Sequence, residues 1–114
     1  MANFLSSRRS IYYYVRPDLI AESMTLKITG HARREAFADR ISVADIKEVL
    51  RIGEIVRLYA QDRPYPSRLV LGFVDGNPIH VVAADVPGTD QTIVITTYRP
   101  DPDIWEGDYK KRKS

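Results

Sequence analysis

The sequence predicts an α+β domain in which N-terminal helices precede a four-stranded antiparallel β-meander. Two observations lead to this prediction. Residues 31–52 contain two short stretches with apolar residues at helical spacing. Residues 54–99 contain four stretches rich in β-branched, leucine and aromatic residues, separated by short turns. Short connections favour antiparallel neighbours, because parallel strands need a longer crossover.

The two helices are the clearest elements. The first is expected over His31–Asp39, with a buried stripe formed by Ala32, Ala36 and Phe37. The second begins after Ser42, a favourable N-cap, and Asp45 three residues later supports the first turn. Its buried face consists of Val43, Ile46, Val49 and Leu50. Gly53 follows at the position where glycine commonly ends a helix.

The expected strands are Glu54–Ala60, Arg68–Asp75, Pro78–Val86 and Thr92–Arg99. A five-residue loop between the last two pairs His80 with Tyr98, Val82 with Thr96 and Ala84 with Val94, and directly opposed residues share a face. The face expected to pack on the helices carries Ile79, Val81, Ala83, Ile93, Ile95 and Thr97. Before the helices, Thr25–Thr29 indicates a further extended piece that this meander does not include.

Composition limits the classes of function. A chain of 114 residues with 44% hydrophobic and 28% charged residues is typical of one globular domain. The absence of cysteine excludes disulfides and thiolate metal sites, and two histidines exclude an all-histidine zinc site. Residues 1–9 place an apolar patch before arginines, the reverse of a secretory signal, and no apolar run reaches about 20 residues. We therefore expect a cytoplasmic protein without a membrane span.

The chain is mildly basic. The formal net charge is +2, and part of the excess lies at Lys110–Lys113. This tail is interpreted either as a solvated, frayed terminus or as an arm that attracts phosphate.

His80 and His31 are the two candidates for proton transfer. In its strand, His80 is either a core histidine with a satisfied hydrogen bond or a general acid or base beside Tyr98 and Thr96. His31, at the start of a helix, is either a capping or surface residue or a functional one. It aligns along one helical face with Arg34, Glu35 and Asp39. Positions i, i+4 and i+8 extend too far along a helix to converge on a metal, so we expect a salt-bridged face and no metal or cofactor.

Several arginines could bind phosphate, because a guanidinium group contacts phosphate through two hydrogen bonds and can stabilise developing negative charge. Phosphate-binding loops, dinucleotide-binding glycine motifs, serine-hydrolase elbows and zinc-protease motifs are all absent from the sequence. Nucleotide hydrolysis, dinucleotide redox chemistry and serine-hydrolase chemistry therefore have no support.

One ordered set of residues resembles a known bacterial family. The set comprises His31-Ala32, Ile41-Ser42, Asp45-Ile46, Gly53-Glu54-Ile55, Tyr59, residues 62–67, Leu71-Gly72, residues 78–82, residues 95–98, Pro100 and Trp105. It resembles the family of domains of unknown function called DUF4258, over roughly residues 26–112. The resemblance makes residues 26–112 a single domain and residues 1–25 an N-terminal extension.

The resemblance implies a fold like that of the RelE, barnase and EndoU-like ribonucleases, and a role as a toxin beside a small zinc-finger antitoxin. Many relatives place arginine four and eight residues after the first histidine, where this chain has Glu35 and Asp39. Carboxylates at these positions are expected to repel phosphate, which speaks against an RNA site centred on His31.

Two hypotheses follow. The first is a metal-independent endoribonuclease toxin that acts on free or ribosome-bound RNA by attack of the 2′-hydroxyl on phosphate. Its proposed catalytic residues are His80, His31, Arg40 and Tyr98, and its substrate-binding residues are Arg34, Arg68 and Thr96. The second is a non-catalytic module that binds protein or RNA, with a homodimer or partner surface that includes Tyr12, Tyr13 and Tyr14.

Overall fold

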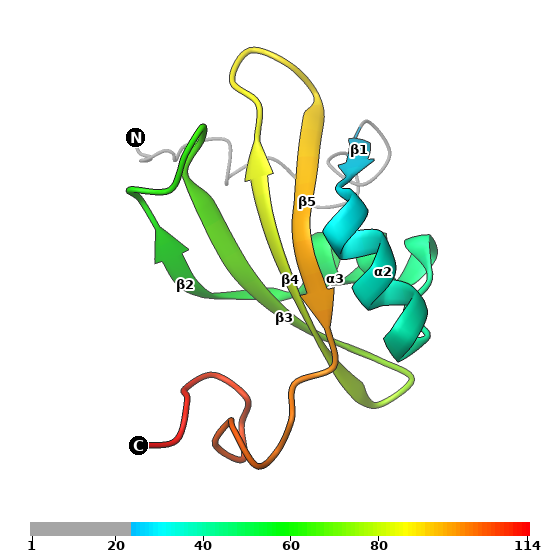
Figure 1. The fold of residues 1–114 in the computed structure, drawn as a ribbon, viewed down its shortest axis with the longest axis vertical. Coiled ribbons are helices and arrows are strands. Elements are labelled where there is room, and N and C mark those ends of the chain that lie inside the picture. The colour runs from blue at the N-terminus through cyan, green and yellow to red at the C-terminus, as the bar shows by residue number, and fades with distance from the viewer. Residues whose placement is uncertain (1–23) are drawn as a thin grey trace.

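The computed structural model describes residues 24–114, which form a five-stranded sheet with two helices (Figure 1). The elements are β1 (Thr25–Ile28), α2 (Gly30–Asp39), α3 (Val43–Ile52), β2 (Glu54–Tyr59), β3 (Ser67–Val74), β4 (Asn77–Asp85) and β5 (Gln91–Tyr98). The strand order is β1-β5-β4-β3-β2. The tyrosine cluster at residues 12–14 and the N-terminal extension up to residue 23 lie outside the described residues.

The predicted fold class is wrong in one respect: the sheet is mixed and has a fifth strand. β1 precedes the helices and pairs in parallel with residues 91–94 of β5. The other four strands pair antiparallel in chain order, so the protein is still α+β. Sequence analysis indicated an extended piece at Thr25–Thr29 but did not place it in the sheet, because four residues show too little alternation to assign a strand partner. The hydrogen-bonding partner of β1, moreover, lies 66 positions later in the chain.

Local capping defines both helices. Thr29 caps α2, its hydroxyl accepting a hydrogen bond from the Ala32 amide at 3.1 Å, and α2 ends at Arg40 in the left-handed conformation. Ser42 and Asp45 form a reciprocal capping box at the start of α3, which confirms the predicted N-terminus. The two helices therefore begin where short-range hydrogen bonds satisfy their first amide groups.

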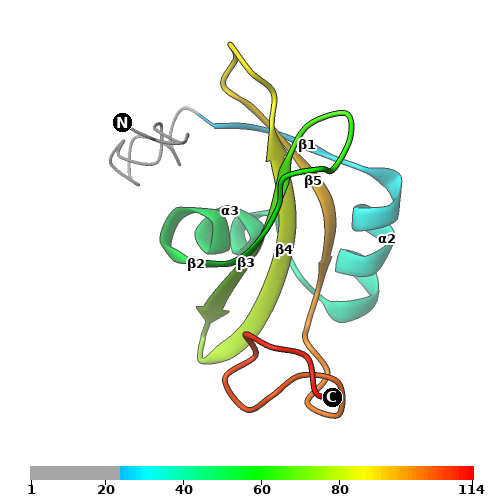
Figure 2. The same cartoon turned by 90° about the vertical axis from the view of Figure 1, so that its left-hand side faces the viewer.

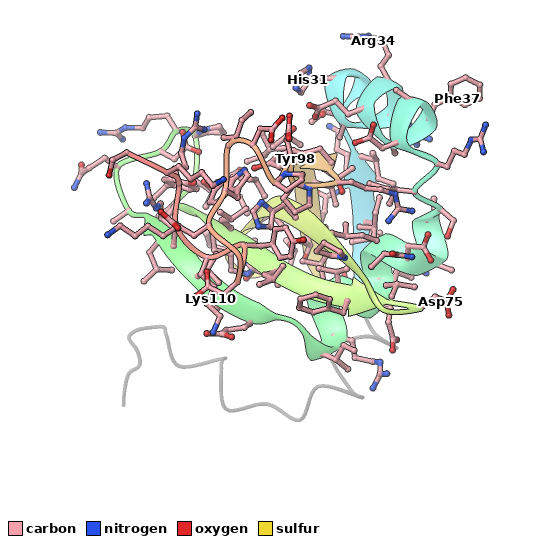
Figure 3. The ribbon with its side chains drawn as sticks, turned by 90° about the horizontal axis from the view of Figure 1, so that it is seen from below. His31, Arg34, Phe37, Asp75, Tyr98 and Lys110 are labelled. Atoms are coloured by element: carbon pink, nitrogen blue, oxygen red, sulfur yellow. The ribbon has the colours of Figure 1, made fainter. Side chains whose placement is uncertain are left out.

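The buried stripe of α2 differs from the predicted one. Ala32 and Ala36 are buried as expected, but Phe37 is 87% exposed. Glu35 and Asp39, which share the inner side of the helix with the alanines, turn toward β5 instead and hydrogen-bond to it. Phe37 therefore lies on the outer face of α2 (Figure 3).

A β-bulge changes the register of the last hairpin. His80 pairs with Tyr98 and Val82 with Thr96, as predicted, but the next pair is Ala83 with Val94. One residue of β5, Ile95, has no opposite partner in β4. The extra residue exchanges the two faces beyond this point. As a result Val94 enters the core, while the side chains of Ile93 and Ile95, predicted to be buried there, are only half-buried.

The helices lie at two different places on the sheet. α3 packs across β3 and β4 on one face, where Val49 meets the backbone at Gly72. α2 lies along β5, beyond the short β1 strand (Figures 1 and 2). The main core fills the space between them with residues from both helices and from β3, β4 and β5. No helix within residues 24–114 is long and apolar enough to cross a membrane.

The C-terminal segment, residues 99–114, turns back toward the sheet on the face that carries His80 (Figure 2). Trp105 is buried and its ring contacts His80 edge-on, with centroids 4.5 Å apart. Lys110 pairs with Glu54 at 3.1 Å, and the Lys113 amide donates to the Ile104 carbonyl. The basic tail is therefore solvated, as one interpretation expected, but it is fixed against the domain and not frayed.

Candidate functional site

His80 lies at the centre of a closed cluster. It has no exposed surface, and both ring nitrogens have partners: Nδ1 is 3.2 Å from the Tyr98 hydroxyl and Nε2 is 2.8 Å from the Tyr109 carbonyl. Because a carbonyl can only accept, Nε2 carries the proton and donates it. Nδ1 then accepts from the Tyr98 hydroxyl. His80 thus joins β5 to the C-terminal segment and offers no free nitrogen to a substrate.

Burial keeps His80 neutral. Desolvation lowers the pKa of His80 below its ordinary value of 6.5, and the hydrogen bond to the Tyr109 carbonyl opposes this only in part. A group that transfers protons must be open to its substrate. Its complete burial therefore removes His80 from the candidate catalytic residues and makes it the residue that orients Tyr98.

An open groove of about 670 Å³ lies beside this cluster. It is lined by Leu58, Tyr59, Ala60, Gln61, Asp62, Val82, Thr96 and Tyr98. We call it the Tyr98 groove. It extends from the end of β2, past Val82 of β4, to the C-terminal half of β5. The groove brings together two residues chosen from the sequence, Thr96 and Tyr98, with Tyr59, which belongs to the set that carries the family resemblance but was not chosen as a site residue.

Tyr98 is half-buried at this groove. Burial raises the pKa of Tyr98, and the neighbouring Tyr59 and Glu35 raise it further, whereas Arg112 lowers it. The phenol therefore stays protonated at neutral pH, with its proton directed to His80 Nδ1. Its oxygen keeps a lone pair, which can accept a hydrogen bond from a ligand hydroxyl.

Glu35 connects this groove to His31. One carboxylate oxygen, Oε1, accepts hydrogen bonds from the Thr96 hydroxyl and, at 3.3 Å, from the Thr97 amide. The same oxygen is 3.1 Å from His31 Nε2. The His31 side chain is 62% exposed, in contrast to His80. Glu35 is therefore held by β5 and in turn holds an accessible imidazole beside a groove-lining residue.

Geometry explains why two carboxylates stand at these helix positions. β1 pairs only with residues 91–94, so no strand within residues 24–114 pairs with the rest of this β5 edge. Glu35 accepts from the Thr97 amide and Asp39 from the Arg99 amide at 2.8 Å. Helix positions i and i+4 are about 6 Å apart, which matches two residues of a strand at about 6.8 Å. The carboxylates accept hydrogen bonds from amides that no strand within the described residues pairs with, so Glu35 is occupied and does not face phosphate alone.

The arginines predicted for the site are dispersed. Arg68 lies on the helix-packed face, opposite Tyr98, and its guanidinium forms a two-pronged contact with Asp85 at 3.1 and 3.3 Å. Arg40 ends α2 at the helix terminus far from His31. Arg34 is exposed one turn after His31, and Figure 3 shows it directed outward. The fold thus brings Arg34, but not Arg68 or Arg40, to the neighbourhood of His31.

Arg112 supplies a positive charge that sequence analysis did not assign to the site. Its guanidinium carbon lies 5.7 Å from the centre of the Trp105 ring, over a residue that is itself buried against His80. Arg112 also lies close enough to Tyr98 to lower its pKa. The signal in the sequence was the basic run at residues 110–113, interpreted there as a whole and not residue by residue.

No group of three or more histidine, cysteine, aspartate or glutamate side chains within residues 24–114 is arranged to hold a metal ion. His31, Glu35 and Asp39 do not converge, because Glu35 and Asp39 contact successive positions along β5.

Comparison with known families shows which family the chain belongs to. Residues 28–99, more than half of the chain, match the family described as "Domain of unknown function (DUF4258)". The chain belongs to the DUF4258 family. In this member the matched region contains α2, α3, all the antiparallel strands and the residues of the Tyr98 groove. Neither a curated protein nor a solved structure is significantly similar to the chain.

Proposed function

We propose that this DUF4258 protein is a metal-independent endoribonuclease of the toxin–antitoxin kind, with its site at the Tyr98 groove and His31 as the proton-transfer residue. The observation that carries the proposal is the contact between His31 Nε2 and Glu35 Oε1, since Glu35 is itself fixed to groove-lining Thr96. An exposed imidazole oriented by a carboxylate is the arrangement that general bases require.

The chemistry assigns one role to each group. Glu35 accepts a hydrogen bond from Nε2–H of neutral His31, which leaves Nδ1 free to remove the proton of an RNA 2′-hydroxyl. The 2′-oxygen then forms a bond to the adjacent phosphorus, the bond from phosphorus to the 5′-oxygen breaks, and the leaving oxygen takes a proton from a water molecule. The resulting hydroxide takes the proton from His31 and restores its neutral form. The products are a 2′,3′-cyclic phosphate and a free 5′-hydroxyl.

Neighbouring side chains bind the phosphate. Arg34, one helical turn from His31, and Arg112, close to Tyr98, supply positive charge that favours the dianionic transition state. The Tyr98 and Thr96 oxygens, whose protons are directed to His80 and Glu35, accept hydrogen bonds from ribose. Glu35 is already in contact with Thr96, Thr97 and His31.

The test is RNA cleavage in EDTA, with and without ribosomes, followed by analysis of the fragment ends. We expect cleavage with 2′,3′-cyclic phosphate ends by the wild type and loss of at least about 100-fold in rate for His31→Ala. Asp39→Asn is the matched control, because Asp39 also contacts the β5 edge but touches no histidine. Intact RNA in every condition, or full activity of His31→Ala, would remove the proposal.

One observation favours a second candidate, a non-catalytic binding module. β2 is the last strand of the sheet within residues 24–114, and Ile52, Ile55 and Leu58 on and before it are exposed by 52%, 40% and 64%. An open strand with apolar side chains can pair with a strand of another protein, such as an antitoxin or a second copy. Size-exclusion chromatography of the wild type and of Leu58→Lys tests the homodimer: a dimer that the substitution dissociates supports this candidate.

A further inference from the structure

We propose that the outer face of α2 is a nucleotide-stacking platform made of Phe37 and the arginines around it, and that it takes a base of single-stranded RNA. This inference rests on the proposed function for RNA as the ligand and for the phosphate at His31. The site on α2 is separate from the Tyr98 groove. Figure 3 shows Phe37 projecting from the same helix as His31 and Arg34, away from the sheet.

Exposure is the first argument. Phe37 is 87% exposed, the highest value among the large hydrophobic side chains of the described residues. The inner side of α2 is already occupied by Ala32, Ala36 and the two carboxylates, so Phe37 has no structural role in the fold. A phenylalanine in water costs free energy relative to burial, and such a residue on a helix is expected to have a partner.

Charge is the second argument, and it selects the partner. Arg33 and Arg34 lie four and three residues before Phe37, so both adjoin its position on the helix surface, and Arg40 follows directly after the end of the helix. All three are exposed, and no ion pair joins them to another residue of the range 24–114. An exposed aromatic ring on a helix surface that also carries exposed arginines matches a nucleotide, whose base stacks and whose phosphates bind arginine.

Continuity with the groove is the third argument. From the groove, contacts run through Thr96 and Glu35 to His31, and Arg34 is the next residue on that side of α2 before Phe37. His31 and Phe37 are six residues apart, about 9 Å along the helix axis. This is a little more than the spacing of adjacent nucleotides in an extended strand. The platform thus binds a base next to the phosphate at His31.

The test is binding of a fluorescent 2′-O-methyl oligoribonucleotide, which cannot be cleaved by 2′-hydroxyl attack, measured by anisotropy at several salt concentrations. We expect Phe37→Ala to weaken binding by roughly 5- to 100-fold, as loss of one base stack does. Phe37→Tyr keeps the aromatic face and is expected to bind like the wild type, whereas Phe37→Leu keeps only apolar area and is expected to bind as weakly as Phe37→Ala.

Two further variants sharpen the result. Arg34→Ala is expected to reduce the slope of log affinity against log salt by about 0.7, the value for one phosphate on a single strand. Val43→Ala, which truncates an exposed apolar residue at the start of α3, is the control and is expected to change nothing. Unfolding midpoints in urea confirm that each variant is folded.

The outcomes separate this inference from the proposed function. Wild-type binding retained in Phe37→Ala, or in Phe37→Leu, overturns the platform even if the enzyme cleaves RNA. Binding that depends on Phe37, in a protein that never cleaves RNA, supports the platform and removes the nuclease. Absence of binding by the wild type overturns the platform. Binding of an acidic peptide that depends on Phe37 would then assign the patch to a protein partner.

Discussion

Glu35 accepts a hydrogen bond from the Thr97 amide, a contact that ties α2 to the part of β5 that β1 does not reach. Thr97 is completely buried, so water cannot replace the carboxylate. The same oxygen contacts Thr96 and His31. A single side chain therefore serves both the fold and the proposed site, and substitutions can separate these roles.

The first prediction concerns stability. Glu35→Ala is expected to lower the free energy of unfolding by about 1–3 kcal/mol, because it leaves the buried Thr97 amide without an acceptor. Asp39→Ala is expected to cost less, because the Arg99 amide that it serves is exposed and water can replace the carboxylate. Urea denaturation measures both. Equal losses for the two variants would show that the buried contact between Glu35 and the Thr97 amide contributes no more to stability than the exposed contact of Asp39.

The second prediction concerns the orientation of His31. Nitrogen-15 NMR at pH 8 is expected to show neutral His31 with its proton on Nε2, because that nitrogen faces Glu35 Oε1. Glu35→Gln is expected to reduce this preference, since a neutral amide oxygen is a weaker acceptor. Asp39→Asn is expected to leave the spectrum of His31 unchanged. An Nδ1–H tautomer in the wild type would contradict the assignment of Nδ1 as the base.

The third prediction is a pH dependence of stability due to His80. The pKa of His80 is lower in the folded protein than its ordinary value of 6.5, so the unfolded chain binds the proton more tightly. The contribution of neutral His80 to the free energy of unfolding is complete above pH 6.5. It is lost as the pH falls from 6.5 through the lower pKa of His80 in the folded protein. Urea unfolding at pH 5.5, 6.5 and 8 measures this loss.

The control for this pH dependence is the other histidine. His80→Gln is expected to flatten the dependence near pH 6, whereas His31→Ala is expected to preserve it, because only His80 is buried. A wild type that is more stable at pH 5.5 than at pH 8 would contradict the neutral, desolvated state of His80.

The fourth prediction concerns Trp105, which covers His80. Trp105→Ala is expected to cost about 3–5 kcal/mol, the usual loss for a buried aromatic residue. It also removes the edge-on contact with His80 and the ring below Arg112. Thermal unfolding measures the loss, and Arg112→Ala is the control that removes the cation alone. A loss for Trp105→Ala as small as that for Arg112→Ala would show that the C-terminal segment contributes little packing.

The fifth prediction compares three glycines. A Cβ at Gly53 would lie 2.4 Å from the Val49 carbonyl oxygen, and one at Gly72 would lie 2.9 Å from a Val49 methyl group. Gly107 has open space around it. Gly72→Ala is expected to cost about 1–3 kcal/mol by overpacking, Gly53→Ala more because backbone must move, and Gly107→Ala almost nothing. Urea denaturation gives the order, and a tolerated Gly53→Ala would contradict the close contact between α3 and β3.

For the candidate site, the sequence identified the residue types better than their grouping. The pairing of His80 with Tyr98 and of Val82 with Thr96 followed from local patterns, whereas the link from Thr96 through Glu35 to His31 is a tertiary contact that the sequence did not indicate. Arg68 could not be excluded from sequence, since its orientation depends on which face of β3 meets α3. Arg112 could not be chosen, since the path of the C-terminal segment follows from the burial of Trp105.

The sequence by itself determined the elements whose causes are local. The start of α3 follows from the hydrogen bonds between Ser42 and Asp45, and the strands of the antiparallel part follow from alternation and short turns. Tertiary structure decided the rest: the parallel β1, the bulge at Ile95, the burial of His80 and the position of Glu35. Each depends on contacts between residues far apart in the chain, where packing and unpaired backbone groups outweigh local preference.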